Sequence, residues 1–204
     1  MPQASQHYRR KNRAGKKFIA WIAAIAVLAG AIVFFITNFY EDTKKNLEEL
    51  NYPQKYSEYV DKAAEEYGLD PALIYAVIRT ESGFDADAQS DAGACGVMQM
   101  MPSSFEWLQE KRGCAGEYSE DDLFNPEICI DYGSYLLKYF YDYYGTERSA
   151  VAAYNAGFVV GDWLADSNYS SDGINLDSIP YPETSNYVER VESAKEMYIK
   201  LYYS

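Results

Sequence analysis

The sequence predicts an all-α domain behind a single N-terminal membrane-spanning helix. Residues 18–36, FIAWIAAIAVLAGAIVFFI, form a run of 19 residues without charge or proline. From residue 53 onward, apolar residues recur at three- and four-residue intervals between helix-start and helix-stop signals. Strand-like alternation of apolar and polar residues is nearly absent. The length of 204 residues fits one compact domain with an additional N-terminal segment.

The apolar run is long enough to cross the hydrocarbon core of a bilayer, which takes about 20 helical residues. A cleaved signal peptide is the alternative, because Ala29-Gly30-Ala31 resembles a small-residue cleavage site. The apolar run, however, continues through that site to Ile36. We therefore favour retention of the segment as a membrane anchor.

The charges around the anchor predict its orientation. Six cations precede it, whereas residues 1–40 contain no Asp or Glu. The positive-inside rule places the N-terminus in the cytoplasm and the residues after about position 40 outside. We expect a basic cytoplasmic tail at 1–17, a transmembrane helix at 18–37, a polar neck at 38–51 and an extracytoplasmic domain at 52–204. The six cations are Arg9, Arg10, Lys11, Arg13, Lys16 and Lys17.

The predicted external part is strongly acidic. All 31 Asp and Glu follow the anchor but only 12 of the 18 Lys and Arg do, so residues 41–204 carry a formal charge of −19. Nucleic acid is therefore excluded as a partner, because its binding requires cationic contacts to phosphate. Any anionic polymer would have to be held by hydrogen bonds and stacking, since the field of the domain repels it.

Three cysteines lie on the predicted external side, where disulfides persist: Cys95, Cys114 and Cys129. Three different single bridges are open to them, and three free buried thiols are a further alternative. We favour Cys114 with Cys129, because these two residues flank the loop GCAGEYSEDDLFNPEIC. Cys-x-x-Cys spacings are absent and the single histidine, His7, precedes the anchor, so we expect no metal site and no cofactor.

Cap and stop signals divide the external domain into successive helices. The first runs from about residue 53 to Gly68. Asp70-Pro71 supplies an N-cap and a first-turn proline for the second, ALIYAVIRTES, which is apolar nearly all round and is expected to be buried. Further helices are expected to begin at Pro102, to run from Pro126 to Gly145 and from Thr146 to Gly157, and to occupy 183–203, with an irregular loop at 167–182.

Glu81 lies at the end of the buried helix and is the candidate catalytic residue. Apolar surroundings destabilise the charged carboxylate, so the pKa of Glu81 should rise and the group should hold a proton near neutral pH. A solvated glutamate at a helix end is the structural alternative. Gly83, Gly93 and Gly96 give the next segment the freedom to fold closely around a ligand. Polar Gln99 among methionines, Met98, Met100 and Met101, suits a sugar, although each methionine alone is more typical of core packing.

The order of five sequence blocks identifies a family. ALIYAVIRTESGF, AGACGVMQMMPSSF, NPEICIDYGSYLL, AYNAG and YPETSNYVERV follow one another along the chain. Together they resemble the soluble-lytic-transglycosylase (SLT) domain, the lysozyme-like fold of glycoside hydrolase family 23. The resemblance covers about residues 52–203. A Glu-Ser pair or AYNAG alone would carry little weight.

The resemblance implies non-hydrolytic cleavage of peptidoglycan between N-acetylmuramic acid (MurNAc) and N-acetylglucosamine (GlcNAc), leaving 1,6-anhydro-MurNAc ends. Glu81 would protonate the glycosidic oxygen and then, as a carboxylate, deprotonate the muramoyl C6 hydroxyl. A second carboxylate is then unnecessary, because the substrate supplies the nucleophile. The resemblance places six residues at the substrate: Ser82 near Glu81, Met98 and Gln99 on the sugar, Tyr154 and Asn155 in the cleft, and Tyr187 with its hydroxyl toward Glu81.

Two cysteines depart from the family pattern, and two other functions compete with this interpretation. Cys95 replaces an aliphatic residue and Cys129 an asparagine, but neither change affects the proposed acid. A goose-type lysozyme would use water, positioned by an acidic residue after Glu81: Asp85, Asp87 or Asp91. A non-catalytic wall-binding assembly subunit would not need the acid. The expected partners are peptidoglycan strands and the membrane, with cell-wall or secretion machinery as further candidates.

Overall fold

The computed structural model describes residues 3–204, without the side chains of residues 3–16 and of Ala24. Residues 1 and 2 of the predicted basic tail therefore lie outside the described residues. The side chain of His7 also lies outside them, as do those of the six cations before the anchor, except Lys17. The chain divides into two compact units, Met1–Asn51 and Tyr52–Ser204.

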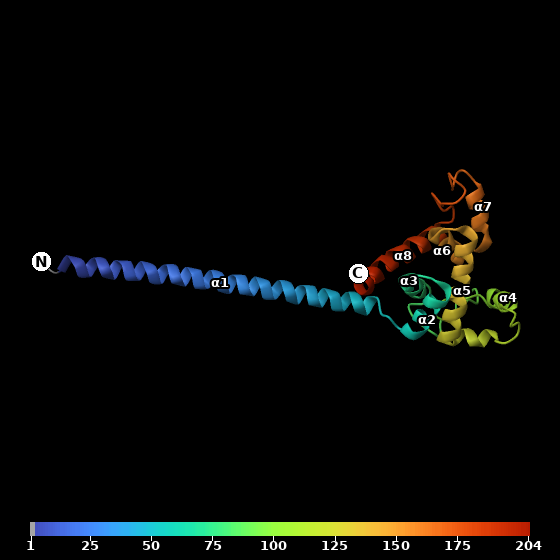
Figure 1. Cartoon of the computed structure of the whole chain (residues 1–204), viewed down its shortest axis with the longest axis horizontal. Coiled ribbons are helices and arrows are strands. Elements are labelled where there is room, and N and C mark those ends of the chain that lie inside the picture. Colours follow the sequence, from blue (N-terminus) through green and yellow to red (C-terminus); the bar gives the residue numbers. More distant parts are fainter. Residues whose placement is uncertain (1–2) are drawn as a thin grey trace. The chain divides into compact units, whose positions relative to one another are not determined.

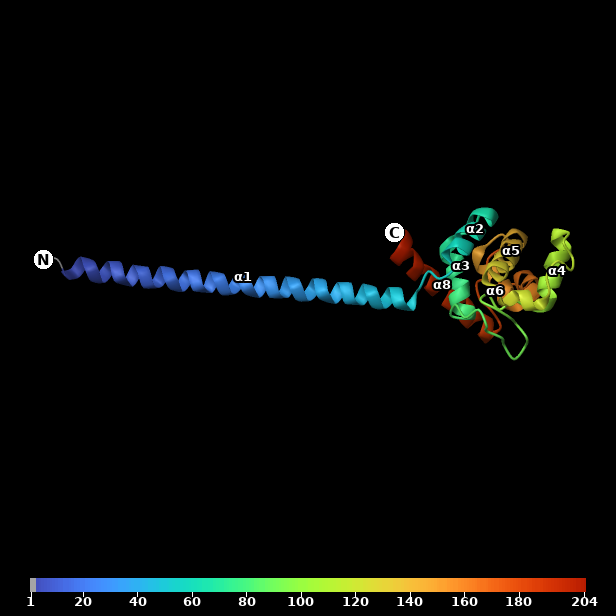
Figure 2. The same ribbon diagram turned by 90° about the horizontal axis from the view of Figure 1, so that it is seen from below.

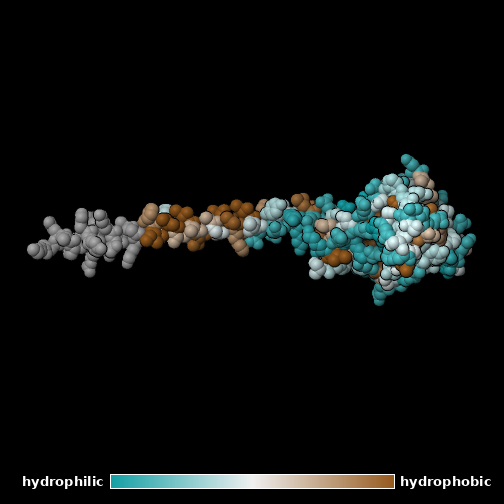
Figure 3. Space-filling view, turned by 90° about the horizontal axis from the view of Figure 1, so that it is seen from above, coloured by the Kyte–Doolittle hydropathy of each residue, from teal (hydrophilic) through white to brown (hydrophobic). Residues whose placement is uncertain are grey.

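The first unit is a single long helix, α1 (Gln3–Asn51), which contains the predicted transmembrane segment and the predicted neck (Figure 1). Its segment Lys17–Asn51 includes a window with a mean hydropathy of 2.8, none of which is buried. The window is the brown band in Figure 3, and the helix becomes hydrophilic after it. Within the described residues, this is the one helix that is long and apolar enough to cross a membrane.

The second unit is all-α, as predicted. Residues 3–204 contain no strand, only isolated bridges that Cys95 forms with Gln89 and with Met100. The domain helices are α2 (Ser57–Tyr67), α3 (Pro71–Glu81), α4 (Pro102–Arg112), α5 (Pro126–Tyr144), α6 (Glu147–Ala156), α7 (Val160–Ala165) and α8 (Pro182–Tyr198). Two short 3₁₀ helices, η1 (Glu120–Phe124) and η2 (Gly157–Val159), adjoin α5 and α6, and a short π-helix, η3 (Ile199–Tyr203), follows α8.

Helix α3 is the centre of the core, because it is apolar on all sides. Every residue from Ala72 to Ile78 is at most 2% exposed. The helix begins at the predicted cap, where Asp70 accepts a hydrogen bond from the Ala72 amide at 2.9 Å and Pro71 occupies the first turn. It packs against α2 and, more extensively, against α8, which lies beside it in Figures 1 and 2. The end of α3 is therefore held rigidly by the core.

Helix α5 packs against α2 and α6 and supports the loop between α3 and α4. Met98 of this loop is fully buried over Gly133 of α5. A Cβ atom at Gly133 would lie only 2.5 Å from the Met98 sulfur. The loop can therefore approach α5 closely only because residue 133 has no side chain.

The predicted disulfide between Cys114 and Cys129 is wrong, because all three cysteines are free thiols. The Cys114 thiol donates to the Gln109 carbonyl and contacts the Tyr132 hydroxyl at 3.3 Å. The Cys129 thiol is buried under the loop between α3 and α4, where the Met98 amide donates to it at 3.4 Å. The two thiols thus have different neighbours, which the spacing of the flanking loop did not indicate.

Gly96 is required where this loop passes η1. Its φ of +72° is in the left-handed region, and an added Cβ atom would lie 2.0 Å from the Leu123 carbonyl oxygen. We expect Gly96→Ala to lower the free energy of unfolding of the external domain by about 3 kcal/mol or more, because backbone strain and overlap with backbone act together. Urea unfolding followed by tryptophan fluorescence measures the change.

Gly93→Ala is the matched control. Gly93 also has a positive φ, +89°, but an added Cβ atom has nothing within 4 Å. Only the strain remains, so the expected loss is about 1 kcal/mol. Equal losses in the two variants would contradict the close packing of Gly96 against Leu123.

Candidate active site

Glu81 is the last residue of α3, and its carboxylate faces α8. The Tyr187 hydroxyl, on a side chain that is 2% exposed, donates a hydrogen bond to Glu81 Oε1 at 2.7 Å. Glu81 itself is half-buried. The structure therefore brings together the predicted acid and the predicted tyrosine, which are 106 positions apart in the chain.

The surroundings of Glu81 change its acidity. Burial raises the pKa of Glu81 from 4.5 to about 7, although the hydrogen bond from Tyr187 and the positive charge of Arg190 both favour the carboxylate. At neutral pH, the protonated acid and the carboxylate are thus both populated. A group with this pKa can give a proton in one step and take one back in the next.

Tyr154 of α6 lies within electrostatic reach of the same carboxyl group. Its hydroxyl donates to the Met98 carbonyl at 2.9 Å. Burial, and after it the Glu81 charge, hold the pKa of Tyr154 well above its usual value, so the phenol stays neutral. Tyr154 therefore connects the loop between α3 and α4 to α6 beside Glu81.

Two of the residues predicted at the substrate, Ser82 and Met98, make structural contacts within the domain. The Ser82 hydroxyl donates to the Val97 carbonyl at 2.8 Å and accepts from the Phe84 amide at 3.1 Å. The Met98 side chain is fully buried against α5 and cannot contact a sugar. Ser82 and Met98 thus hold the loop between α3 and α4 against the core. The prediction that the Met98 side chain contacts the sugar is wrong, whereas the placement of partly exposed Ser82 at the substrate stays a prediction.

Gln99 is partly exposed, with a φ of +47°. Its amide nitrogen donates to the carbonyls of Ala88 and Gly96, both at 3.0 Å, which closes the loop on itself. Its Oε1 atom has no hydrogen-bond partner in the described part of the chain. Gln99 is therefore a loop-fixing residue that still has an acceptor to offer.

Asn155 follows Tyr154 at the end of α6 and is exposed. Its Oδ1 accepts from the Thr184 hydroxyl at 2.8 Å, which fixes the orientation of the amide. The amide nitrogen makes no hydrogen bond within residues 3–204 and remains available as a donor.

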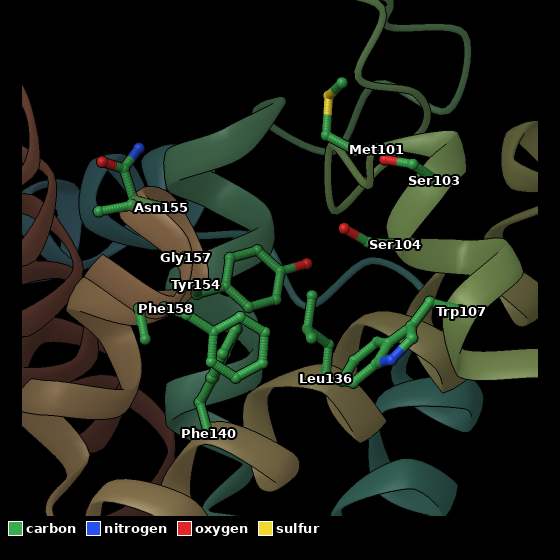
Figure 4. Close-up of a pocket in the computed structure, with 12 residues that line it drawn as sticks. Met101, Ser103, Ser104, Trp107, Leu136, Phe140, Tyr154, Asn155, Gly157 and Phe158 are labelled. Atoms are coloured by element: carbon green, nitrogen blue, oxygen red, sulfur yellow. The ribbon is translucent and has the colours of Figure 1, made fainter. Parts of the chain in front are cut away.

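A pocket of about 410 Å³ extends from Tyr154 and Asn155 to α4. Figure 4 shows Trp107 and Ser104 of α4 facing the Tyr154 ring, with Phe158 on the same side as Tyr154. Glu81 does not line this pocket, and Tyr154 links the two. Sequence reasoning missed the aromatic wall of Trp107 and Phe158, for which a tryptophan in the short α4 was the only signal.

The acidic residues after Glu81 are directed to solvent. Asp85, Asp87 and Asp91 are all exposed. Asp85 accepts a hydrogen bond from the Asp87 amide at 3.0 Å, as in an ordinary turn. No group of three or more His, Cys, Asp or Glu among the described residues could hold a metal ion.

Comparison with known proteins agrees with this geometry. A family model described as "Transglycosylase SLT domain" matches residues 58–174, which is more than half of the chain. The chain belongs to the transglycosylase SLT family. The SLT match begins in α2 and includes Glu81, Gln99, Tyr154 and Asn155, whereas Tyr187 lies beyond its end.

Similar proteins include two lytic transglycosylases. The soluble lytic murein transglycosylase of Escherichia coli (strain K12) is 32% identical over 149 residues, which are 72% of this chain and 23% of that protein. The membrane-bound lytic murein transglycosylase C of Actinobacillus pleuropneumoniae (serotype 5b) is 29% identical over 170 residues, covering 72% of this chain and 47% of that protein. The SLT chain described here thus spans less than half the length of either relative.

Solved structures show the same SLT fold. An inactive mutant of lytic transglycosylase Slt from Pseudomonas aeruginosa matches with a TM-score of 0.65 and 30% identity, over 74% of this chain and 25% of that chain. The 70 kDa soluble lytic transglycosylase of Escherichia coli matches with a TM-score of 0.67 and 28% identity, over 75% and 25%. The fold that the sequence blocks implied is therefore confirmed.

The raised pKa of Glu81 predicts a pH dependence of stability. A folded-state pKa of about 7 above an ordinary 4.5 means that the folded protein holds a proton that the unfolded chain has released. This contribution is complete below pH 4.5 and is lost as the pH rises through 7. Relative to Glu81→Gln, the free energy of unfolding of the wild type should fall by up to about 3 kcal/mol across that window.

Urea unfolding of both proteins at several pH values measures this difference. All other titrating groups are shared, so they cancel when the two proteins are compared. A difference that stays constant from pH 4.5 to 7 would show that Glu81 has an ordinary pKa in the folded protein.

Proposed function

We propose that the protein is a membrane-anchored lytic transglycosylase of peptidoglycan. It cleaves the MurNAc-β-1,4-GlcNAc bond without water and leaves 1,6-anhydro-MurNAc ends. The observation that carries this proposal is the half-buried Glu81, with a pKa of about 7 and the Tyr187 hydroxyl 2.7 Å from its carboxylate. The named relatives and solved structures, which are lytic transglycosylases, support the same reaction.

In the first step, protonated Glu81 gives its proton to the glycosidic oxygen as the bond from that oxygen to the muramoyl C1 breaks. The leaving GlcNAc end departs as a neutral alcohol. Tyr187 donates to one carboxyl oxygen of Glu81, so it orients the group and stabilises the charge that the carboxylate acquires. Tyr187 is thus a positioning residue.

In the second step, the Glu81 carboxylate removes the proton from the muramoyl C6 hydroxyl. The C6 oxygen bonds to C1 and closes the anhydro ring, while Glu81 recovers the proton that it gave away. No water is consumed and no second carboxylate is needed, since the nucleophile is already held in the substrate.

Neutral groups around Glu81 suit an uncharged sugar chain. The Gln99 Oε1 and the Asn155 amide nitrogen offer one acceptor and one donor. Trp107, Phe158 and the Tyr154 ring give apolar walls on which sugar rings can stack. These groups bind glycan by hydrogen bonding and packing, which the acidic surface of the domain does not oppose.

The proposal includes the anchor and its orientation. Residues 18–37 cross the membrane once, the basic tail stays in the cytoplasm, and residues 52–204 work outside. Support comes from the apolar window of α1 and from the positive charge before it. A relative is itself named a membrane-bound lytic murein transglycosylase.

Two rival functions, a hydrolytic lysozyme and a non-catalytic wall-binding subunit, are distinguished from this one by the experiments below. A hydrolytic lysozyme needs a second carboxylate for water, yet Asp85, Asp87 and Asp91 face solvent in this structure. A wall-binding subunit without catalysis would not require an acid with its pKa raised by burial.

Replacement of the acid tests catalysis. Glu81→Gln should reduce glycan cleavage by about a thousandfold or more, because neither proton transfer can occur, and should leave binding to insoluble peptidoglycan within about twofold. Release of soluble fragments measures cleavage, and co-sedimentation with peptidoglycan measures binding.

The matched controls are Asp85→Asn, Asp87→Asn and Asp91→Asn, which make the same change from carboxylate to amide. Each should keep cleavage within about twofold of the wild type. A loss in one of them as large as that of Glu81→Gln would favour water activation by that aspartate. Full cleavage by Glu81→Gln would defeat the assignment of the acid.

Orientation of the anchor gives a separate expectation. With the chain expressed in intact cells, a thiol reagent that cannot cross membranes should label a cysteine placed at Ser57, at the start of α2, and should not label one placed at Ser5. Labelling is read in a background in which Cys95, Cys114 and Cys129 are serine. Labelling of Ser5→Cys but not of Ser57→Cys would reverse the topology.

A further inference from the structure

A second pocket, of about 480 Å³, lies between the end of α3 and the outer side of α8. It is separate from the aromatic pocket at α4, and the two share no residue. Its polar lining includes Arg79, Thr80, Asn186, Glu189, Arg190 and Ser193. Nothing in the reaction proposed above uses this pocket.

Two arginines line this pocket in a domain that is otherwise strongly acidic. Arg79 lies over the Tyr52 ring, 4.1 Å from its centre, so its guanidinium is held at the pocket wall. Arg190 is exposed and forms no ion pair with any described residue. A pair of cations at one pocket is the arrangement that binds a carboxylate or another anion.

Thr80 adds an unused polar group to the same wall. Its hydroxyl is enclosed and has no hydrogen-bond partner in the described part of the chain. Because this oxygen has no exposed surface, it is not itself a contact for a ligand, and the two guanidinium groups of the pocket carry the recognition.

The pocket adjoins the proposed point of cleavage. Thr80 directly precedes Glu81, and Asn186 directly precedes Tyr187. The charge of Arg190 also reaches Glu81, whose pKa it lowers. A ligand held here would therefore be bound by residues next in the chain to Glu81 and Tyr187.

We propose that this pocket binds the peptide stem of the peptidoglycan, with Arg79 and Arg190 on a stem carboxylate. This inference rests on the proposed function. In peptidoglycan the peptide stem is joined to the lactyl group of MurNAc by an amide bond, so the sugars are uncharged and the charges lie on the stems. The stem is therefore the part of the strand that attracts guanidinium groups. Glu189, in the same pocket, fits an ammonium group of the same peptide.

The test compares two substrates with the full chain in detergent. One is uncross-linked glycan with its peptide stems. The other is the same glycan after an amidase has removed the stems and the lactyl carboxylates that this hydrolysis exposes have been converted to neutral amides. Arg190→Gln should lower kcat/KM on stem-bearing glycan about tenfold, through loss of charge-assisted hydrogen bonds, and on stem-free glycan less than about twofold. The ratio of the two values removes any effect of Arg190 on Glu81 itself.

Two further variants complete the design. Ser193→Glu, which removes no group from the core, should reproduce the effect by adding a repelling carboxylate at the rim. Lys55→Gln makes the same charge change as Arg190→Gln on an exposed residue outside the pocket and should leave the ratio unchanged.

An unchanged ratio in both Arg190→Gln and Ser193→Glu would overturn the stem inference, while anhydro ends on either substrate would leave the proposed function intact. If the wild-type protein formed no 1,6-anhydro products from either substrate, the proposed function itself would be contradicted. Co-sedimentation with phosphatidylglycerol vesicles covers the other anion source. If Arg190→Gln weakened binding to these vesicles but left the ratio of kcat/KM on the two glycans unchanged, the pocket would be assigned to lipid and the proposal contradicted.

Discussion

The hydrogen bond from Tyr187 to Glu81 joins α3 and α8 at the point where the proposed chemistry occurs. Its length of 2.7 Å depends on the packing of the two helices over most of their lengths. Every residue of α3 from Ala72 to Ile78 is buried, so the helix is enclosed on all sides. In α8, the buried residues Val188, Val191 and Ala194 form one side of the helix. Because the apolar core positions both helices, the acid is held where water is scarce and its pKa rises.

The loop between α3 and α4 depends on the same two helices and on α5. Ser82 ties its start to Val97, and Met98 enters the space that Gly133 leaves on α5. The Met98 carbonyl then receives the hydroxyl of Tyr154. The residues beside Glu81 are thus supported by core contacts, and the loop can have tight turns at Gly96 and Gln99 without losing its position.

Much of the fold could be predicted from local signals. Asp70-Pro71, Asn125-Pro126 and Thr146 mark helix starts that the structure shows at those positions. The short α7 carries no such cap and was not predicted. The apolar residues before Glu81 indicated burial, and burial is the physical cause of its raised pKa.

The rest of the site depends on contacts between distant residues. Nothing near Met98 in the chain shows that Gly133 makes room for it, so its burial could not be anticipated. Loop spacing suggested a Cys114–Cys129 bridge, but the neighbours of each thiol are determined by packing. The pairing of Glu81 with Tyr187 came from the resemblance to a family, since 106 residues separate them.

The central claim is that Glu81 serves a reaction whose nucleophile belongs to the substrate. Digestion of peptidoglycan in oxygen-18 water, followed by mass spectrometry of the released ends, tests it most directly. We expect 1,6-anhydro-MurNAc ends that contain no oxygen-18. Reducing MurNAc ends that carry the heavy isotope at C1, formed in proportion to the bonds cleaved, would contradict it.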